Sequence, residues 1–305
     1  MATSVPEISV IVASFGGDAA IRGCLESLHE QHGGVAAEVI VADATGQLEA
    51  TQVSRRFPDT TVVRVGGQPT IPALRAAALR RSRGDIVAVM NEYCVADPHW
   101  YEEIVRTHEA HPDCVAVGGA VENASRGRLT DWAAYFCEYS RYMLPVPART
   151  VDDIPGHNVS YKRRAFEQVP DLDAVLCRGF WESTLHPILR RRGERFLSAP
   201  SVVVYYTKRF GFGQFLRQRY HYSRHYAGDV VAGAAWLRRA FRIATVWALP
   251  AVLLGRIVAR VARKRRHMRE LALSSPMLVI FTAVWAAGEA VGALCGAGRS
   301  LHEVR

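Results

Sequence analysis

The segment GDIVAVMNEYCVADPHW, Gly84–Trp100, decides the predicted fold of the first part of the chain. Residues 86–90 form an apolar run typical of a buried strand, which stops abruptly at Asn91, Glu92 and Tyr93. Strands that are apolar along their whole length are normally covered on both faces, as in parallel sheets. Ligands of such sheets collect where the strands end at their carboxyl edge. The segment therefore predicts a parallel α/β sheet with polar binding residues at that edge.

The same alternation of strands and helices continues on both sides of this segment. Further strands are predicted at residues 8–16, 37–46, 60–67, 114–122, 156–162 and 195–206. Helices are predicted at residues 19–31, 71–82, 101–111 and 180–193. A less regular stretch extends from residue 123 to about Pro155. The pattern predicts one catalytic-type α/β domain over residues 1–210, with Asp43 and Asn91 at the same edge of its sheet.

The positive charge of the chain lies in its last third. Residues 1–204 hold 21 Lys and Arg against 25 Asp and Glu, whereas residues 205–305 hold 17 against 4. Such a basic tail can bind nucleic acid or anionic lipid. The segments Ile243–Gly255 and Pro276–Gly298 are too apolar for a nucleic-acid surface, and the second has the ~20 residues that a membrane-spanning helix needs. We therefore expect membrane lipids as partners and no nucleic acid.

The tail is predicted to consist of a basic aromatic connecting helix over residues 211–240 and a membrane-associating helical hairpin over residues 241–305. Glu289 would be costly in mid-bilayer unless it is paired. The basic stretch Arg263–Glu270 should stay cytoplasmic, and six scattered cysteines suit a reducing compartment. We expect a membrane-associated protein with a cytoplasmic catalytic domain, and the number of crossings stays open. The alternative is a basic helical pair that packs on a partner subunit.

Five sequence blocks follow one another in a characteristic order. They are ISVIVASFGG with LESLHEQ, EVIVADATG, LRAAALRRSRGDIVAVMNEYC, PGHNVSYKRRAF and WESTLHPILRRRGERFLSAP. Over residues 7–205 this order resembles the inverting family 2 glycosyltransferases of GT-A fold. The resemblance implies a Rossmann-like, mostly parallel sheet flanked by helices and followed by a membrane-associating tail. It also implies transfer of a sugar from a nucleotide-sugar donor to a glycan or lipid-linked acceptor at the cytosolic membrane face.

The resemblance gives individual positions a role. Asp43 stands where the family's acidic residue hydrogen-bonds the nucleotide base, and Glu182 stands at the second acid of the family's Glu-Asp pair, its catalytic base. A general base of this type takes the proton of the acceptor hydroxyl. The positions implied to contact the donor nucleotide are Ala13, Ser14, Phe15, Asp43, Arg75 and Asp85.

Asn91-Glu92-Tyr93 aligns with the family's metal-binding carboxylate triplet, which implies Mg²⁺ or Mn²⁺ held by Glu92 and Asn91. Hard cations prefer oxygen ligands, and here only Glu92 is a carboxylate. Three alternatives stay open. Glu92 holds the metal together with water and phosphate oxygens, or cations such as Lys208 and Arg209 replace part of the metal's charge, or the activity has been lost.

Other readings of the same residues remain. Asp43 and Asp85 have the ordinary roles of turn or cap carboxylates, and Glu182 that of an acid in the first turn of a helix. A catalytically degenerate scaffold or binding module is the main alternative to an enzyme. A nucleotidyltransferase ranks third, because its first loop would need a lysine that ASFGGDAAIRG lacks.

Overall fold

The computed structural model describes residues 5–167 and 169–304, whose contacts divide the chain into two compact units. The first unit comprises Met1–Glu122 and Tyr142–Thr207, and the second comprises Asn123–Arg141 and Lys208–Arg305. The second unit therefore takes a segment from the middle of the predicted α/β domain. Each unit is described separately below.

The described residues form a sheet of nine strands in the order β3-β2-β1-β4-β8-β6-β9-β5, with β7 paired to β9. Strands β3, β2, β1 and β4 are parallel, whereas the β4–β8, β6–β8, β5–β9 and β7–β9 pairs are antiparallel. The strands are β1 (Ile8–Ser14), β2 (Ala37–Asp43), β3 (Thr60–Arg64), β4 (Ile86–Asn91), β5 (Cys94–Ala96), β6 (Cys114–Asn123), β7 (Arg149–Val151), β8 (Asn158–Lys162) and β9 (Arg195–Tyr206).

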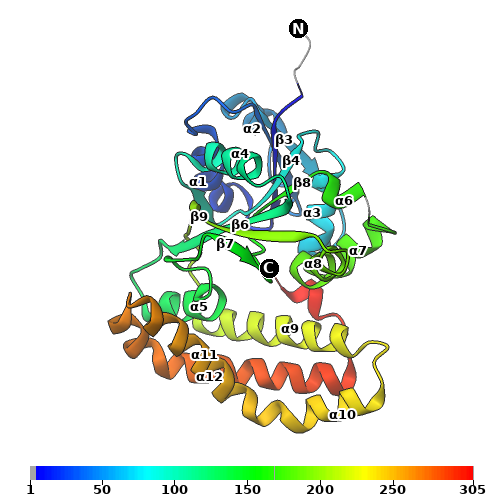
Figure 1. Ribbon diagram of the computed structural model, residues 1–305, viewed down its shortest axis with the longest axis vertical. Coiled ribbons are helices and arrows are strands. Elements are labelled where there is room, and N and C mark those ends of the chain that lie inside the picture. The colour runs from blue at the N-terminus through cyan, green and yellow to red at the C-terminus, as the bar shows by residue number, and fades with distance from the viewer. Residues whose placement is uncertain (1–4, 168, 305) are drawn as a thin grey trace. The chain divides into compact units, whose positions relative to one another are not determined.

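Helices cover both faces of this sheet, which explains why its central strands are apolar throughout. Figure 1 shows α1 and α4 on one side of the sheet and α3, α7 and α8 on the other. Ile8, Val10, Ile11 and Val12 of β1 are fully buried between these layers. The helices are α1 (Gly17–His29), α2 (Ala50–Arg56), α3 (Ile71–Leu79), α4 (Trp100–Ala110), α6 (Arg164–Glu167), α7 (Leu172–Arg178) and α8 (Trp181–Arg191).

The register of the parallel strands defines the carboxyl edge predicted from the sequence. Ser14 pairs with Asp43, and Ala13 pairs with Asn91. The ends of β1, β2 and β4 are therefore side by side, and the loops that follow them lie at one edge. The predicted carboxyl edge with Asp43 and Asn91 is confirmed, and the predicted parallel pairing holds for β1 to β4, whereas β5 to β9 make antiparallel pairs.

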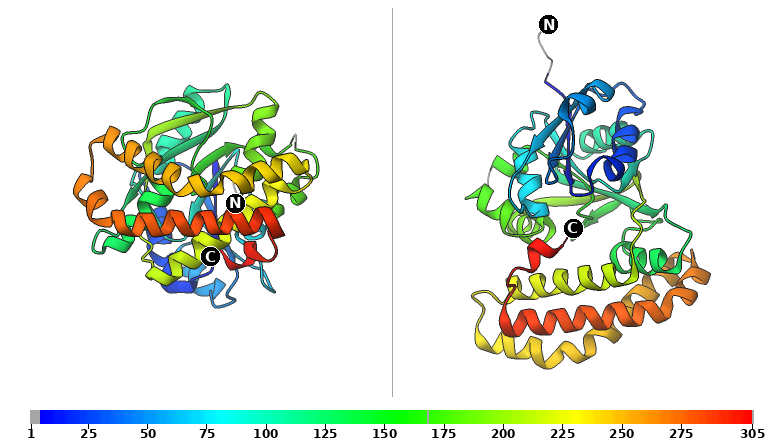
Figure 2. Two further views of the ribbon diagram at one scale, coloured as in Figure 1. Left: turned by 90° about the horizontal axis from the view of Figure 1, so that it is seen from below. Right: turned by 180° about the vertical axis from the view of Figure 1, so that it is seen from behind.

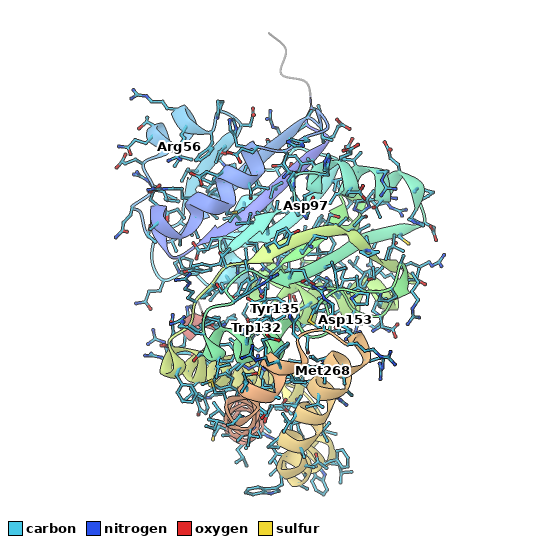
Figure 3. All side chains as sticks on the ribbon, turned by 90° about the vertical axis from the view of Figure 1, so that its left-hand side faces the viewer. Arg56, Asp97, Trp132, Tyr135, Asp153 and Met268 are labelled. Atoms are coloured by element: carbon cyan, nitrogen blue, oxygen red, sulfur yellow. The ribbon has the colours of Figure 1, made fainter. Side chains whose placement is uncertain are left out.

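The second unit is helical. In it α12 runs alongside α9, as Figure 2 shows, and Trp132 and Tyr135 lie next to one another on α5, with ring centroids 6.1 Å apart (Figure 3). The packing of α12 on α9 is close because Gly288 faces the Ser223 hydroxyl and Gly292 faces the Arg224 carbonyl. The elements are α5 (Leu129–Tyr139), α9 (Phe212–Val231), α10 (Trp236–Thr245), η1 (Val246–Ala248), α11 (Leu249–Lys264), α12 (Met268–Cys295) and η2 (Ser300–Glu303).

In the part of the chain that the structure describes, two helical stretches are long and apolar enough to cross a membrane, Arg239–Lys264 and Met268–Cys295. In the most apolar part of Arg239–Lys264, only 6% of the residues are buried within the protein. In the most apolar part of Met268–Cys295, 44% are buried. Glu289 of α12 accepts hydrogen bonds from Arg242 Nη2 at 2.6 Å and from Trp285 Nε1 at 2.7 Å. The buried carboxylate is therefore paired, as its place in an apolar helix requires.

Candidate active site

The Glu92 carboxylate is held by the loop between β1 and α1. It accepts hydrogen bonds from the Ser14 hydroxyl at 2.8 Å, from the Phe15 amide at 3.1 Å and from the Gly16 amide at 3.1 Å. The Tyr93 hydroxyl is also hydrogen-bonded to Glu92, and burial together with this carboxylate raises the pKa of Tyr93 to about 12. Glu92 is only 4% exposed. The carboxylate thus has a donor from each of four neighbouring residues.

The backbone of the loop between β1 and α1 attracts a carboxylate. Successive backbone amides ahead of a helix form a cradle for an anion, and the positive end of the helix dipole adds to it. Glu92 occupies that cradle at the start of α1. A Cβ atom at Gly16 would come within 2.9 Å of the Tyr93 hydroxyl, so glycine lets the loop close over the acid.

These residues do not fit a divalent metal site. The oxygens of Glu92 face protein donors, and Oδ1 of Asn91 accepts a hydrogen bond from the Tyr93 amide at 2.9 Å. Both oxygen ligands that the resemblance implied are therefore engaged within the protein. No group of three or more His, Cys, Asp or Glu side chains that could hold a metal occurs among residues 5–167 and 169–304.

Arg75 reaches the end of β4 from α3. Its Nη2 lies 3.1 Å from Nδ1 of His157, and Nδ2 of Asn91 lies 3.5 Å from the same nitrogen. A guanidinium can only donate hydrogen bonds, so Nδ1 of His157 acts as the acceptor and the ring proton is on Nε2. Arg75 is 2% exposed, and Thr70 caps the N-terminus of its helix through the Ala73 amide. A buried cation is thus fixed beside Asn91.

Glu182 lies in the first turn of α8 and approaches the loop before β8. A Cβ atom built on Gly156 would be 2.6 Å from Oε2 of Glu182, so the acid passes directly over this glycine. The next residue, His157, contacts Arg75 and Asn91. Glu182, Arg75 and Asn91 therefore lie around Gly156 and His157.

A buried pair of side chains lies one helical turn beyond Glu182. The Tyr161 hydroxyl and Nε2 of His186 are 2.6 Å apart. Burial, and then the charge of Arg75, lowers the pKa of His186 to about 3, so this imidazole stays neutral. Burial, and then the charge of Glu182, raises the pKa of Tyr161. Tyr161 and His186 therefore form a neutral hydrogen-bonded pair near Glu182 and Arg75.

Asp43 lies at the predicted edge but is turned into its own loop. Its carboxylate accepts hydrogen bonds from the Thr45 amide at 2.8 Å, the Thr45 hydroxyl at 2.7 Å and the Leu48 amide at 3.3 Å. Its side chain is fully buried. The acid therefore shapes the loop after β2, and a contact with a nucleoside remains a prediction.

Asp85 requires a correction, because the structure does not bring it to this edge. It immediately precedes β4, whereas Asn91 ends that strand, and its side chain is exposed. At ~3.3 Å per residue the two positions are ~20 Å apart along the strand. Asp85 therefore lies at the amino edge of the sheet, next to Arg163, whose amide donates to the Asp85 carbonyl at 2.8 Å.

The remaining predicted donor residues lie on the loop that holds Glu92. Ala13 and Phe15 are half-buried, and the Ser14 side chain is fully buried with its hydroxyl directed to Glu92. Lys208 and Arg209, the predicted alternative source of positive charge, belong to the second unit, where Nζ of Lys208 lies 4.7 Å from the centroid of the Phe210 ring. Their predicted role toward the donor is untested.

The sequence did not reveal two features of this site. In the sequence, Gly156-His157-Asn158 matches a family position near the acceptor and also fits a turn before a strand, but neither reading indicated a partner from α3 that is 82 residues away. His186 follows Glu182 by four residues, which places both on one face of α8. That spacing was the available signal, but the partner of His186, Tyr161, comes from β8.

Residues 9–169 match the family described as Glycosyl transferase family 2. Over 101 residues the chain is 34% identical to a glucosyl-dolichyl phosphate glucuronosyltransferase of Haloferax volcanii. That alignment covers 30% of each protein, so the chain spans under a third of this relative's length.

One solved structure supports the same fold. A mannosyltransferase from Pyrobaculum calidifontis, in complex with GDP-Man and Mn²⁺, superposes with a TM-score of 0.55 over 96% of this chain and 88% of its own, at 20% identity. TarS 1-349 of S. aureus in complex with UDP-GlcNAc gives a TM-score of 0.48 at 14% identity, over 93% and 91% of the two chains. The first superposition confirms the predicted α/β fold class.

Proposed function

Because the chain belongs to glycosyl transferase family 2, we propose that it moves a sugar from a nucleotide-sugar donor to the hydroxyl of an acceptor, with inversion at the anomeric carbon. One observation supports this reading above the others. Arg75, Asn91 and Glu182 meet around Gly156 and His157 at the carboxyl edge of the sheet, where an acid and a buried cation are both available. A transferase needs such a pair, since it removes a proton and stabilises a departing diphosphate.

Glu182 is the proposed general base. Its carboxylate takes the proton of the acceptor hydroxyl while that oxygen bonds to the anomeric carbon. The bond from this carbon to the diphosphate breaks on the opposite side, and the nucleoside diphosphate leaves with the electron pair. A displacement of this kind needs only one protein carboxylate, which suits a site where other acids are engaged elsewhere.

The donor is proposed to lie along the loops after β1 and β2. Ala13 and Phe15 border the first loop, and Asp43 fixes the second through Thr45 and Leu48. Arg75 provides positive charge at the neighbouring strand end. The known relatives bind or transfer different sugars, so the donor sugar is to be identified by experiment.

The decisive test uses the purified full chain with a panel of UDP- and GDP-sugars and a lipid-phosphate acceptor. Glu182→Gln should lower the transfer rate by ~10²-fold or more, the usual contribution of a general base. Binding of UDP or GDP should be retained. A matched control is Glu30→Gln, because Glu30 is exposed at the end of α1. A chain that binds nucleotide but transfers nothing, both before and after the substitution, would be a degenerate binding module.

We further propose that the second unit attaches the enzyme to the cytosolic face of a membrane and that the acceptor is a glycan or is lipid-linked. Support comes from the exposed apolar side chains of α10 and the turn after it. Trp236, Leu237, Phe241 and Trp247 are 73%, 63%, 71% and 87% exposed. Apolar surface of this kind combined with basic residues favours anionic lipid headgroups. The basic stretch Arg263–Arg266 favours the cytosolic side.

Co-sedimentation with vesicles tests the attachment. Vesicles containing phosphatidylglycerol should bind the chain more tightly than vesicles of pure phosphatidylcholine. The double substitution Trp236→Ser and Trp247→Ser should reduce partitioning by ~10-fold or more, because two large apolar side chains leave the interface. Val5→Ser is the matched control, since Val5 is 67% exposed in the first unit. Equal losses in the two variants would argue against this surface.

A further inference from the structure

We infer that Glu92 clamps the β1–α1 loop and does not bind a metal, so that a nucleoside diphosphate binds to this chain without a divalent cation. The inference rests on the proposed donor-binding function and concerns the chemistry of the same site. The residues of the Asn91-Glu92-Tyr93 segment do not fit a cation site.

The hydrogen bonds to Glu92 concentrate on one of its oxygens. Oε2 accepts the Ser14 hydroxyl at 2.8 Å and the Phe15 and Gly16 amides at 3.1 Å, and the Phe15 amide also lies 3.2 Å from Oε1. The Tyr93 hydroxyl is bonded to the same carboxylate. A cation that bound Oε2 would have to displace these donors and leave the buried Ser14 hydroxyl without its partner, which is costly.

Asn91 and Tyr93, the other two residues of the segment, are also engaged in hydrogen bonds within the protein. Oδ1 of Asn91 accepts the Tyr93 amide, and Nδ2 of Asn91 is turned to His157. The Tyr93 hydroxyl is hydrogen-bonded to the Glu92 carboxylate. The two neighbours of Glu92 therefore act as its supports, and neither supplements it as a metal ligand.

Arg75 provides positive charge for the phosphates of the donor. In a site without a cation, fixed positive groups must take over the stabilisation of a diphosphate. Arg75 is such a group, because its planar guanidinium carries five N–H donors and suits phosphate oxygens. Its contact with His157 orients it at the end of β4, where Asn91 also lies.

The clamp also has a mechanical consequence. Ser14, Phe15 and Gly16 are the last residue of β1 and the two residues ahead of α1. Their common attachment to Glu92 ties this loop to the residue that follows β4. The loop that borders the proposed donor site is thus held in place before any ligand arrives.

Two measurements on the full chain test the inference. Calorimetry measures the affinities for UDP and for GDP, once in EDTA and once with Mn²⁺. Electron spin resonance measures how much Mn²⁺ binds to the protein alone. We expect the two affinities to agree within ~2-fold, which corresponds to ~0.4 kcal/mol, and we expect no protein-bound Mn²⁺. Tightening by Mn²⁺ of ~10-fold or more, or a bound Mn²⁺ signal that Glu92→Gln abolishes, would overturn the inference.

The Glu92→Gln variant separates a clamp from a ligand. A glutamine amide would direct its own N–H groups at the amides of the loop, so the midpoint temperature of unfolding should fall and nucleotide affinity should weaken equally with and without Mn²⁺. Glu30→Gln should change neither quantity. If neither nucleotide binds under any condition, the proposed donor-binding function fails, whereas the Mn²⁺ signal and the thermal midpoint still decide the role of Glu92.

Discussion

Nη2 of Arg75 lies 3.1 Å from Nδ1 of His157, and this contact joins α3 to the loop that carries Gly156. The arginine is buried and the imidazole nitrogen is its acceptor, so the geometry of the cation depends on a neutral ring. Asn91 approaches the same nitrogen at 3.5 Å. One histidine atom therefore sets the positions of an arginine and an asparagine at the proposed donor site.

This relationship predicts a difference between two substitutions of His157. In His157→Gln the amide oxygen can still accept the Arg75 hydrogen bond, whereas His157→Leu leaves the guanidinium without that acceptor. We expect nucleotide affinity to fall by ~10-fold in the leucine variant and by ~3-fold or less in the glutamine variant, since a hydrogen bond to a charged group contributes ~1.5–3 kcal/mol. Calorimetry with UDP and GDP measures both values. Equal affinities in the two variants would show that the contact does not position Arg75.

Gly156→Ala should impair transfer without preventing folding. The added Cβ atom would come within 2.6 Å of Oε2 of Glu182, so the carboxylate must move away from the acceptor position. A displacement of ~1 Å can lower a rate by ~10²-fold. We expect a fall in kcat with little change in nucleotide affinity, measured by steady-state transfer and calorimetry.

The control for this prediction is Gly213→Ala, because an added Cβ at Gly213 meets no atom within 4 Å. It should leave kcat unchanged. If Gly156→Ala also kept its full kcat, the position of the Glu182 carboxylate would not matter for transfer. Another acid would then have to be the general base.

Hydropathy predicted the long strands and helices of the first unit but missed its short elements α2, β5, β7 and α7. The strands β1, β2 and β4 are apolar because both of their faces are covered, and period and length then distinguish them from helices. The carboxyl edge follows from parallel pairing, which aligned Ser14 with Asp43 and Ala13 with Asn91. Helix α5 was missed, because its burial is provided by α12, which follows more than 120 residues later in the chain.

The side chains of the site were less predictable than the strands that carry them. A sequence places Glu92 at a strand end, but its orientation toward the β1 loop depends on amides that lie 76 and 77 residues earlier. Asp85 was assigned to the donor by resemblance, although the direction of β4 already puts it at the opposite end from Asn91. Pairing partners of this kind come from the tertiary structure, and no local pattern encodes them.

In the second unit, Arg242 is predicted to be essential for the packing of α10 on α12. The side chain of Glu289 is 7% exposed and is bonded to Arg242 Nε at 3.0 Å and Nη2 at 2.6 Å. Removal of one partner of a buried pair costs ~3–5 kcal/mol, because the remaining charge has no compensation. Arg242→Ala should therefore lower the midpoint temperature of unfolding, measured by circular dichroism in detergent.

The double variant Arg242→Ala with Glu289→Gln provides the control. The glutamine carries no charge and can still accept the Trp285 Nε1 hydrogen bond, which is 2.7 Å long in the native chain. Most of the lost thermal stability should return. A double variant as unstable as Arg242→Ala would indicate that the arginine acts through its packing on Tyr226, whose ring centroid is 5.3 Å from the guanidinium carbon.

Acid should destabilise the first unit through two buried histidines, His108 and His186. Burial lowers the pKa of each to about 3 from the ordinary 6.5, so both are neutral in the folded chain. The unfolded chain takes up these protons first, and stability is therefore lost as the pH falls from about 6.5 toward about 3, by about 2 kcal/mol per histidine at about pH 5. His186→Gln should flatten the dependence of the thermal midpoint on pH between about pH 7 and about pH 5. His111→Gln, at an exposed position, should keep the native slope, and an unchanged slope in His186→Gln would mean that this ring is not the group that binds the proton.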